Sequence, residues 1–356
     1  MSEHPFSTKT EKPLSWTLIL VLFFSACGFV VPPACIGQIY QWQDETGARH
    51  FSDGPTPDLP ASLLGTEQNA VEPTSRHPSP KIEIPARLDA APGAKGVLWR
   101  IERSGLRPSF LMGTIHVEDE RVLQLSPAAE LAFSATDALV LELVLDEVAV
   151  FKAAAAMIYM DGTDLKAVLG EDLFTKTASA MKTYGVPEIA LRRMKPWAVM
   201  STLMVPKPKT GNFLDLLLYR RAVQSGKSVF GLETVEEQVG VLESLPLKDQ
   251  IEILRETLDQ FELFPRVFST MIEMYLAGDL DGLAALSERF IQTQDRGLVN
   301  RFMERLNDNR NLRMAERLQT YLEQGNVFVA VGALHLSGEN SLLRLLEARG
   351  YTVIPG

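Results

Sequence analysis

The chain has 356 residues, of which 46% are hydrophobic and 22% charged, and its formal net charge is −10. This apolar fraction excludes a disordered chain, and the acidic balance argues against a protein that binds nucleic acid. Two cysteines are too few for a disulfide framework or a thiolate zinc site.

The N-terminal segment has the composition of an export signal. Residues 14–31 form an uncharged apolar run that is preceded by Lys9 and Lys12 and followed by two prolines. This order is typical of a secretory signal peptide, so residues 1–37 are expected to be removed. Two alternatives remain open, an uncleaved inner-membrane anchor and a lipoprotein modified at Cys27. All three predict an exported protein of bacterial type, located in the periplasm or associated with the cell envelope, and the two alternatives imply membrane association.

Residues 38–60 predict a small β module. Two β-prone runs flank a turn-forming segment, in the pattern Ile-Tyr-x-Trp-x-Asp-x-x-Gly-x-x-His-Phe-Ser-Asp. The pattern resembles the domain of unknown function numbered 4124, which is often found after signal peptides in envelope proteins and implies no activity. Trp42 and His50 are expected to pack across the hairpin. Residues 61–95 are rich in Pro, Ser, Ala and Gly and predict a linker to the main domain, residues 96–356.

The main domain predicts an α/β fold. Short apolar runs at 109–112, 138–141, 228–232 and 327–331 read as strands covered on both faces. They predict a mostly parallel sheet flanked by helices, with a large helical insertion between Val235 and Leu322. The predicted helices cover residues 126–135, 145–159, 173–184, 189–204, 213–224, 235–245, 247–277, 280–292, 298–322 and 342–348, and a short strand covers 351–354.

A polar residue follows each of the four apolar strands, namely His116, Glu142, Glu233 and His335. Ligands bind at the carboxyl ends of parallel strands, so these side chains are expected to converge on one edge of the sheet. The main domain has two histidines, and both lie in the context strand, Gly, two residues, His. We expect Gly113 and Gly332 to allow a sharp turn and the close approach of a ligand.

Two imidazoles with one or two carboxylates suit a divalent metal such as Zn, Mn or Co. The same groups without a metal would suit general acid–base catalysis. The structural alternative is a pair of satisfied core histidines beside solvated carboxylates.

At these motifs the domain resembles the TraB/GumN family, which is related to the Tiki proteases. The resemblance covers about 96–356 and is carried by Val97–Glu102, Phe110–His116, Leu139–Glu142, Lys195–Trp197, Gly231–Thr234 with Gln238, Arg310–Asn311 with Met314–Ala315, and Val331–Leu336. It implies a metal-dependent hydrolase, specifically a peptidase, with His116 and His335 as its two histidines and Glu142 as its acidic residue. Glu233, Arg310 and Asn311 match other recurrent positions of the family. More distant relatives are erythromycin esterases and haem-binding proteins.

The expected mechanism has a divalent ion held by His116, His335 and Glu142, which acidifies a bound water. Glu233, or Glu142 if it is not a ligand, would accept the proton from that water. Arg310 would stabilise the oxyanion, unless it is a solvated arginine on a helix. Lys195–Trp197 either lines the cleft or combines a helix-entry proline with a core tryptophan.

The expected partner is a peptide or small-molecule substrate. The competing functions are a non-catalytic envelope protein that binds haem or another ligand at the histidine pair, and a structural envelope factor.

Overall fold

The computed structural model describes residues 40–43, 49–52, 96–290 and 304–356, with side chains for 96–286 and 304–356. Strands β1 (Tyr40–Gln43) and β2 (Arg49–Ser52) form an antiparallel hairpin in which Trp42 lies opposite His50. The predicted hairpin is therefore confirmed. The predicted leader, its cleavage site, Cys27 and the linker lie outside the described residues, as do the ends of two predicted helices between 291 and 303.

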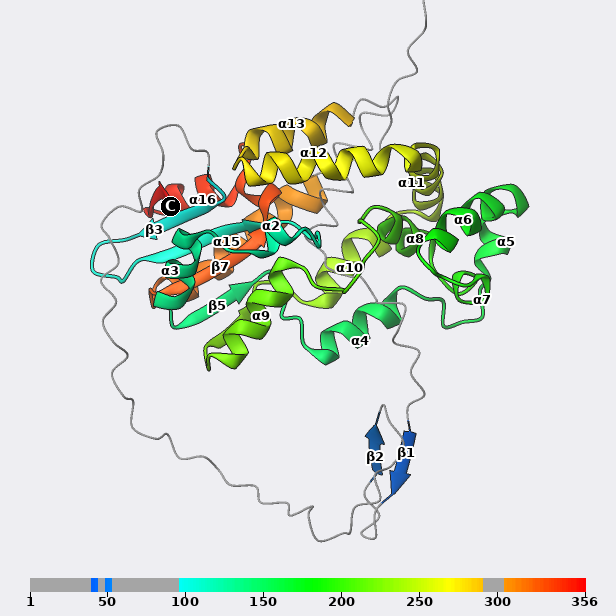
Figure 1. The fold of residues 1–356 in the computed structure, drawn as a ribbon, viewed down its shortest axis with the longest axis horizontal. Coiled ribbons are helices and arrows are strands. Elements are labelled where there is room, and N and C mark those ends of the chain that lie inside the picture. The colour runs from blue at the N-terminus through cyan, green and yellow to red at the C-terminus, as the bar shows by residue number, and fades with distance from the viewer. Residues whose placement is uncertain (1–39, 44–48, 53–95, 291–303) are drawn as a thin grey trace, which may run out of the picture. The chain divides into compact units, whose positions relative to one another are not determined.

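Residues 96–356 form an α/β unit, as predicted (Figure 1). Its sheet has six strands in the order β6-β5-β7-β4-β3-β8. Neighbouring strands are parallel from β6 to β4, whereas β3 is antiparallel to both β4 and β8. The strands are β3 (Leu98–Glu102), β4 (Ser109–Thr114), β5 (Ala138–Leu141), β6 (Ser228–Gly231), β7 (Val327–Gly332) and β8 (Thr352–Pro355).

Strand β3 was not among the predicted strands. Its sequence mixes apolar and charged side chains, with Leu98 and Ile101 buried and Arg100 paired with Glu102. It lacks the continuous apolar run of the central strands because only part of its surface is covered. Missing this strand leaves the predicted parallel part of the sheet unchanged, since β3 is an additional antiparallel strand beside β4.

Helices cover the sheet on both faces. Phe110, Leu139 and Phe328 on one face pack with α3 (Pro127–Ala135) and α9 (Leu214–Gln224). Leu111, Val140 and Val329 point to the other face, which packs with α15 (Asn309–Leu322) and α16 (Leu342–Ala348). Alternate residues of each central strand are therefore buried on opposite sides, as a sheet between two helical layers requires.

Two long helical connections occupy the rest of the unit. The connection from β6 to β7 is the predicted helical insertion. The remaining helices are α2 (Glu120–Leu123), α4 (Glu147–Ala156), α5 (Leu165–Leu169), α6 (Glu171–Thr183), α7 (Glu188–Leu191), α8 (Pro196–Leu203), α10 (Val235–Glu243), α11 (Leu247–Gln260), η2 (Phe261–Leu263), α12 (Phe264–Leu276), α13 (Leu280–Phe290), the π-helix η3 (Glu304–Asp308) and η4 (Ala333–Leu336).

Two predicted helices are wrong in length, because each is divided into two. The helix predicted over 189–204 is split, since Lys195 has extended backbone and Pro196 starts α8. The helix predicted over 247–277 is split by η2, after which Pro265 lies in the first turn of α12. In the first helix, Pro196 favours the extended backbone of Lys195 and then starts α8. In the second, the irregular residue is Gln260, with φ −108° and ψ 0°, while Phe264 keeps helical angles and Pro265 is accommodated in the first turn of α12.

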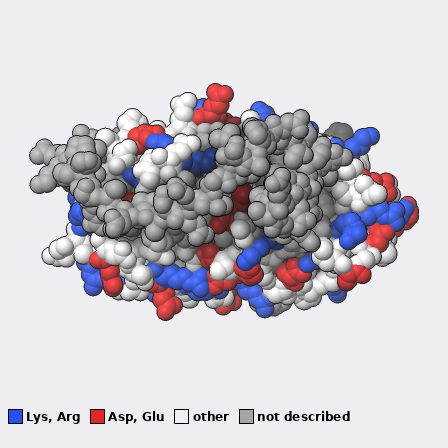
Figure 2. All heavy atoms as spheres, turned by 90° about the horizontal axis from the view of Figure 1, so that it is seen from below, with Lys and Arg blue, Asp and Glu red and all other residues white. Residues whose placement is uncertain are grey.

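The described surface mixes charges of both signs. On the face shown in Figure 2, the Lys and Arg side chains are interspersed with Asp and Glu. Within the described part of the chain, every helix is too short or too polar to cross a membrane.

Candidate active site

The four predicted site residues lie at the carboxyl ends of four adjacent parallel strands. Glu142 directly follows β5, Glu233 follows β6, His116 follows β4, and His335 lies in η4 directly after β7. Thr114 pairs with Gly332 across β4 and β7, so the two Gly-x-x-His segments start side by side. The expected convergence on one sheet edge is observed, and all four residues are buried.

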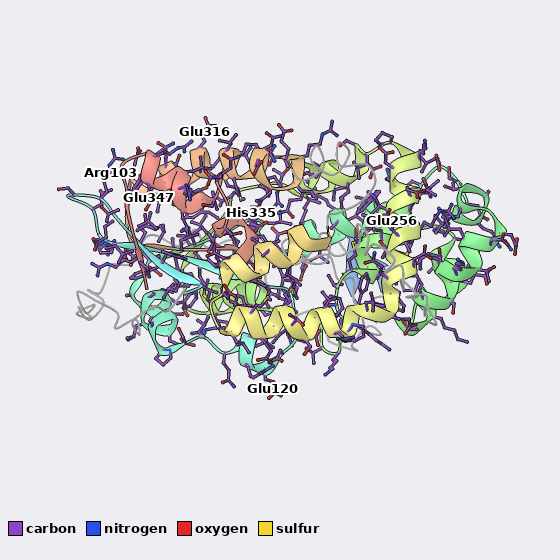
Figure 3. The ribbon with its side chains drawn as sticks, turned by 90° about the horizontal axis from the view of Figure 1, so that it is seen from above. Arg103, Glu120, Glu256, Glu316, His335 and Glu347 are labelled. Carbon is purple, nitrogen blue, oxygen red and sulfur yellow. The ribbon has the colours of Figure 1, made fainter. Side chains whose placement is uncertain are left out.

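Asn311 fixes the ring of His335. The Asn311 Nδ2 group donates to the carbonyl oxygen of Asn340 at 2.9 Å, so Asn311 Oδ1 is the atom that faces His335 Nδ1 at 2.6 Å. His335 Nδ1 must therefore carry the proton, and Nε2 carries the lone pair. Figure 3 shows His335 in the interior of the ribbon, whereas the labelled Glu120 and Glu316 lie at its edges.

Glu142 faces that lone pair, with 3.4 Å between His335 Nε2 and Glu142 Oε1. Burial, followed by the charge of Arg310, lowers the pKa of His335, so the imidazole is neutral. A lone pair facing a carboxylate oxygen is repulsive unless a proton or a cation lies between them. The pair therefore fits a cation, and it equally fits a proton on Glu142.

Arg310 holds both glutamates. Its Nη2 atom lies 2.5 Å from Glu142 Oε2 and 2.6 Å from Glu233 Oε2, and its side chain is 1% exposed. The alternative of a solvated Arg310 is therefore wrong. The role of Arg310 in oxyanion stabilisation stays a prediction. In this structure its guanidinium is paired with two carboxylates.

The two glutamates have opposite proton affinities. Burial raises the pKa of Glu142 to about 7; Glu233 adds to this effect, while Arg310 and the Gly332 amide oppose it. Burial also acts to raise the pKa of Glu233, but Arg310, Arg313 and Gln238 outweigh it and lower the value. Glu142 is therefore the better proton acceptor at neutral pH, and Glu233 is a weak base held in its ionised form.

His116 forms a separate pair with Asp215, a residue absent from the predicted site. His116 Nε2 lies 3.1 Å from Asp215 Oδ2, and Asp215 Oδ1 accepts a hydrogen bond of 2.9 Å from Thr114 Oγ1. The charge of Asp215 also contributes to the raised pKa of Glu142, so the two histidine–carboxylate pairs interact electrostatically. The sequence carried a signal for Asp215, because it falls on the buried stripe of α9 with Leu218 and Ala222.

Neither Gly113 nor Gly332 has a positive φ, so neither glycine is required here by an unusual backbone angle. A Cβ on Gly113 would lie 3.0 Å from both Ala333 Cα and Leu336 Cδ1, so this glycine lets η4 pack against β4. The Gly332 amide donates to Glu142 Oε1 at 2.6 Å. The close approach of a ligand that was expected at these glycines stays a prediction.

The predicted ligands are brought together in part. Glu142 and His335 are in contact, whereas His116 contacts Asp215. Among residues with described side chains, no group of three or more His, Cys, Asp and Glu is arranged to hold a metal ion. The set His116, His335 and Glu142 stays a prediction for the metal-bound form.

A cleft of about 560 Å³ opens beside His116. The imidazole forms part of its wall and meets the Phe213 ring edge-on, with 4.5 Å between the ring centroids. Glu142 and His335 are buried and do not line the cleft. A volume of this size is ordinary for a small-molecule or peptide-side-chain site.

Lys195–Trp197 has a structural role. Trp197 is 1% exposed and donates from Nε1 to Glu243 Oε2 at 3.2 Å, and Lys195 pairs with the same carboxylate at 2.6 Å. Neither residue lines the cleft beside His116. Of the two predicted roles, the helix-entry proline with a core tryptophan is the one observed.

Several metalloproteases are similar to this chain. It is 28% identical over 312 residues to Metalloprotease TIKI1 of Xenopus tropicalis, with 72% of this chain and 61% of the relative covered. It is 26% identical over 310 residues to Metalloprotease TIKI2 of Danio rerio, with coverage of 72% and 60%. The chain thus spans about 60% of the length of these relatives.

A bacterial relative is matched over a shorter region. The Escherichia coli (strain K12) protein named Uncharacterized protein YbaP is 32% identical over 138 residues, with 38% of this chain and 47% of the relative covered. No solved structure matches the chain.

Family models match both parts of the chain, as the sequence motifs indicated. The model of the domain of unknown function 4124 matches residues 25–90, and that of the TraB/PrgY/gumN family matches residues 97–355. The second match includes every residue of the candidate site and most of the chain. The chain belongs to the TraB/PrgY/gumN family.

Proposed function

We propose that the protein is an exported, divalent-metal-dependent hydrolase that cleaves peptides in the cell envelope. Relatives named metalloproteases support the hydrolase and the metal. The apolar N-terminal run at residues 14–31 supports export. The buried strand-end site supports the location of the chemistry.

The contact between His335 and Glu142 carries the proposal. A neutral imidazole with Nδ1 held by an amide oxygen is the arrangement of a histidine metal ligand. His335 Nε2 and Glu142 Oε1 would hold the ion, and His116, as the second histidine of this edge, would complete the set. When bound, Mn, Co or Zn would polarise a substrate carbonyl and acidify a water.

The chain's own residues prepare the site for this chemistry. Asn311 orients His335, while Arg310 and the Gly332 amide hold the two oxygens of Glu142. Asp215 orients His116 at the wall of the cleft, where a substrate would meet the imidazole. With Glu142 as a ligand of the ion, Glu233 is the residue that would accept the proton. Glu142 would take this role only if it is not a ligand, and its higher pKa favours it in that case.

A cleavage assay tests the proposal. The purified full chain is treated with a chelator and then mixed with a fluorogenic peptide library, with and without Mn, Co or Zn. We expect activity to be lost on chelation and restored by at least one of these metals, and both His116→Ala and His335→Ala to be inactive. His77→Ala, in the predicted linker, is the control and should retain activity.

Full metal binding and cleavage by both histidine variants would contradict the proposed site. Haem absorption together with an absence of cleavage would support the ligand-binding alternative instead.

A further inference from the structure

The cleft beside His116 has one strongly apolar wall. Phe264, Phe268 and Ile272 are spaced four residues apart on α12 and present one helix face to the cleft. Phe213 continues this wall up to the ring of His116. An aromatic wall of this kind binds a large apolar group, because it removes that group from water on several sides.

The acidic residues near the cleft mouth are mostly committed to the protein. Glu118 accepts hydrogen bonds from the backbone amides of Lys209, Thr210 and Gly211 at 2.8, 2.7 and 2.6 Å. Asp119 is paired with Arg121 through two side-chain contacts. The three amides anchor the segment 209–211 to Glu118, whose carboxylate keeps its charge, whereas Arg121 pairs with the charge of Asp119.

Lys207 and Lys209 remain at the mouth as exposed cations. Both line the cleft, and neither forms a salt bridge with a described residue. Glu262, on η2, also lines the cleft, and it forms no salt bridge with a described residue. The lining thus carries the cations Arg121, Lys207 and Lys209 beside the carboxylates Glu118, Asp119 and Glu262. Lys207 and Lys209 are exposed on one segment, where a negative group of a ligand would pair with their ammonium groups.

We propose that the cleft binds a peptide segment with a large apolar side chain and an adjacent carboxylate. The apolar side chain lies against Phe213, Phe264 and Phe268, and the carboxylate meets Lys207 and Lys209. The segment then passes the imidazole of His116. As the substrate preference of a peptidase, this inference rests on the proposed function, whereas the binding itself does not.

Binding of defined peptides to the full chain tests the inference. The probe is fluorescein-Gly-Gly-Ala-Gly-Phe with a free C-terminal carboxylate, followed by fluorescence anisotropy in EDTA, which prevents metal-dependent cleavage. Replacing Phe by Ala, or amidating the C-terminus, should each weaken binding by about tenfold or more. An amidated probe ending in Phe-Asp shows whether a side-chain carboxylate replaces the terminal one.

Charge reversal at the mouth gives the decisive comparison. The double variant Lys207→Glu, Lys209→Glu should lose the preference for the acid probe and bind the amide probe more tightly, because its carboxylates repel that of the acid. Both lysines are exposed, so the fold is expected to persist. Ser269→Trp, at the exposed edge of the apolar wall, should weaken binding of the Phe probe. Lys248→Glu is exposed on α11 outside the cleft and should keep the wild-type preference.

Equal binding of the Phe and Ala probes, or an unchanged acid preference in the double variant, would overturn the inference. Failure of the proposed function looks different, because the peptides would bind selectively and remain uncleaved when metal is added. Cleavage of the library without this selectivity would leave the proposed function standing and remove the substrate preference.

Discussion

At the residue scale, Arg310 is the side chain on which the site most depends. Its guanidinium is buried between Glu142 and Glu233, two carboxylates that would otherwise repel each other in a low dielectric. The half-exposed Arg313 touches Glu233 from the solvent side at 3.0 Å. The two arginines therefore provide a direct comparison of a buried and a partly solvated ion pair.

Arg310→Met is expected to lower the free energy of unfolding by about 3–5 kcal/mol, because two buried carboxylates lose their counter-charge. Arg313→Met should cost about 1 kcal/mol or less, since water screens its pair. Urea denaturation at neutral pH measures both values. Equal losses in the two variants would contradict the central role of Arg310.

Glu142 gives a prediction with a definite pH sign. Its pKa is raised from 4.5 to about 7, so between these values the folded protein keeps a proton that the unfolded chain releases. The stability contributed by that proton is complete below pH 4.5 and is lost as the pH rises through 7. In EDTA, the free energy of unfolding of Glu142→Gln, measured relative to the wild type, should therefore rise by about 3 kcal/mol between pH 5 and pH 8.

The control for this prediction is Glu237→Gln. Arg317 lowers the pKa of Glu237 to about 2, so the stability that it contributes is present above about 4.5 and is lost only as the pH falls toward 2. The stability difference from wild type should be flat between pH 5 and 8. A flat curve for Glu142→Gln as well would show that the pKa of Glu142 is not raised.

Asn311 is predicted to act as a positioning residue for His335. Asn311→Ala removes the acceptor for Nδ1, so the ring is free to rotate and the affinity for a divalent metal should fall by about 10–100-fold. Titration calorimetry with Co or Mn measures this change. The control is Asn309→Ala, at an exposed position at the start of α15, which should bind metal as the wild type does.

At the element scale, the contact between β4 and η4 fixes the two Gly-x-x-His segments relative to each other. Gly113→Ala places a Cβ against the backbone of Ala333, so η4 must shift, at a cost of about 1–3 kcal/mol. Gly240→Ala, in α10, meets nothing within 4 Å and should be neutral or stabilising by up to about 1 kcal/mol. Thermal or urea unfolding distinguishes the two, and a harmless Gly113→Ala would contradict this packing.

The elements also show what a sequence pattern can and cannot predict. Continuous apolar runs identified β4, β5, β6 and β7, because strands buried on both faces need them. The mixed apolar and charged sequence of β3 was not recognised, and two helices whose apolar spacing was continuous were divided, one of them at Pro196. The spacing of apolar residues indicates which side chains are buried. A proline changes the backbone without changing this spacing.

The residues of the candidate site that directly follow a strand were predicted from the sequence. His116, Glu142, Glu233 and His335 were placed at one edge because parallel strands end together. Asp215 could not be placed from its strand context, since a helix carries it to His116 from a distant part of the chain. The pairing of Arg310 with two glutamates depends in the same way on the tertiary packing of α15.

At the scale of the whole molecule, the family match covers the entire sheet and its helical insertion. The site is assembled from both ends of this domain, because β4 and β7 are adjacent in the sheet but more than 200 residues apart, as the hydrogen bond from the Val327 amide to Ser109 Oγ also shows. A metal at the site would therefore join distant segments and stabilise the folded domain as a whole.

Metal content is the measurement that tests the central claim most directly. The full chain is stripped with EDTA, incubated with Mn, Co and Zn in turn, desalted and analysed by inductively coupled plasma mass spectrometry. The account predicts about one tightly held ion per wild-type chain for at least one metal, and a loss of that ion in His335→Ala and in Glu142→Gln. A wild-type chain that retains none of the three metals, or a His335→Ala chain that retains as much as the wild type, would contradict it.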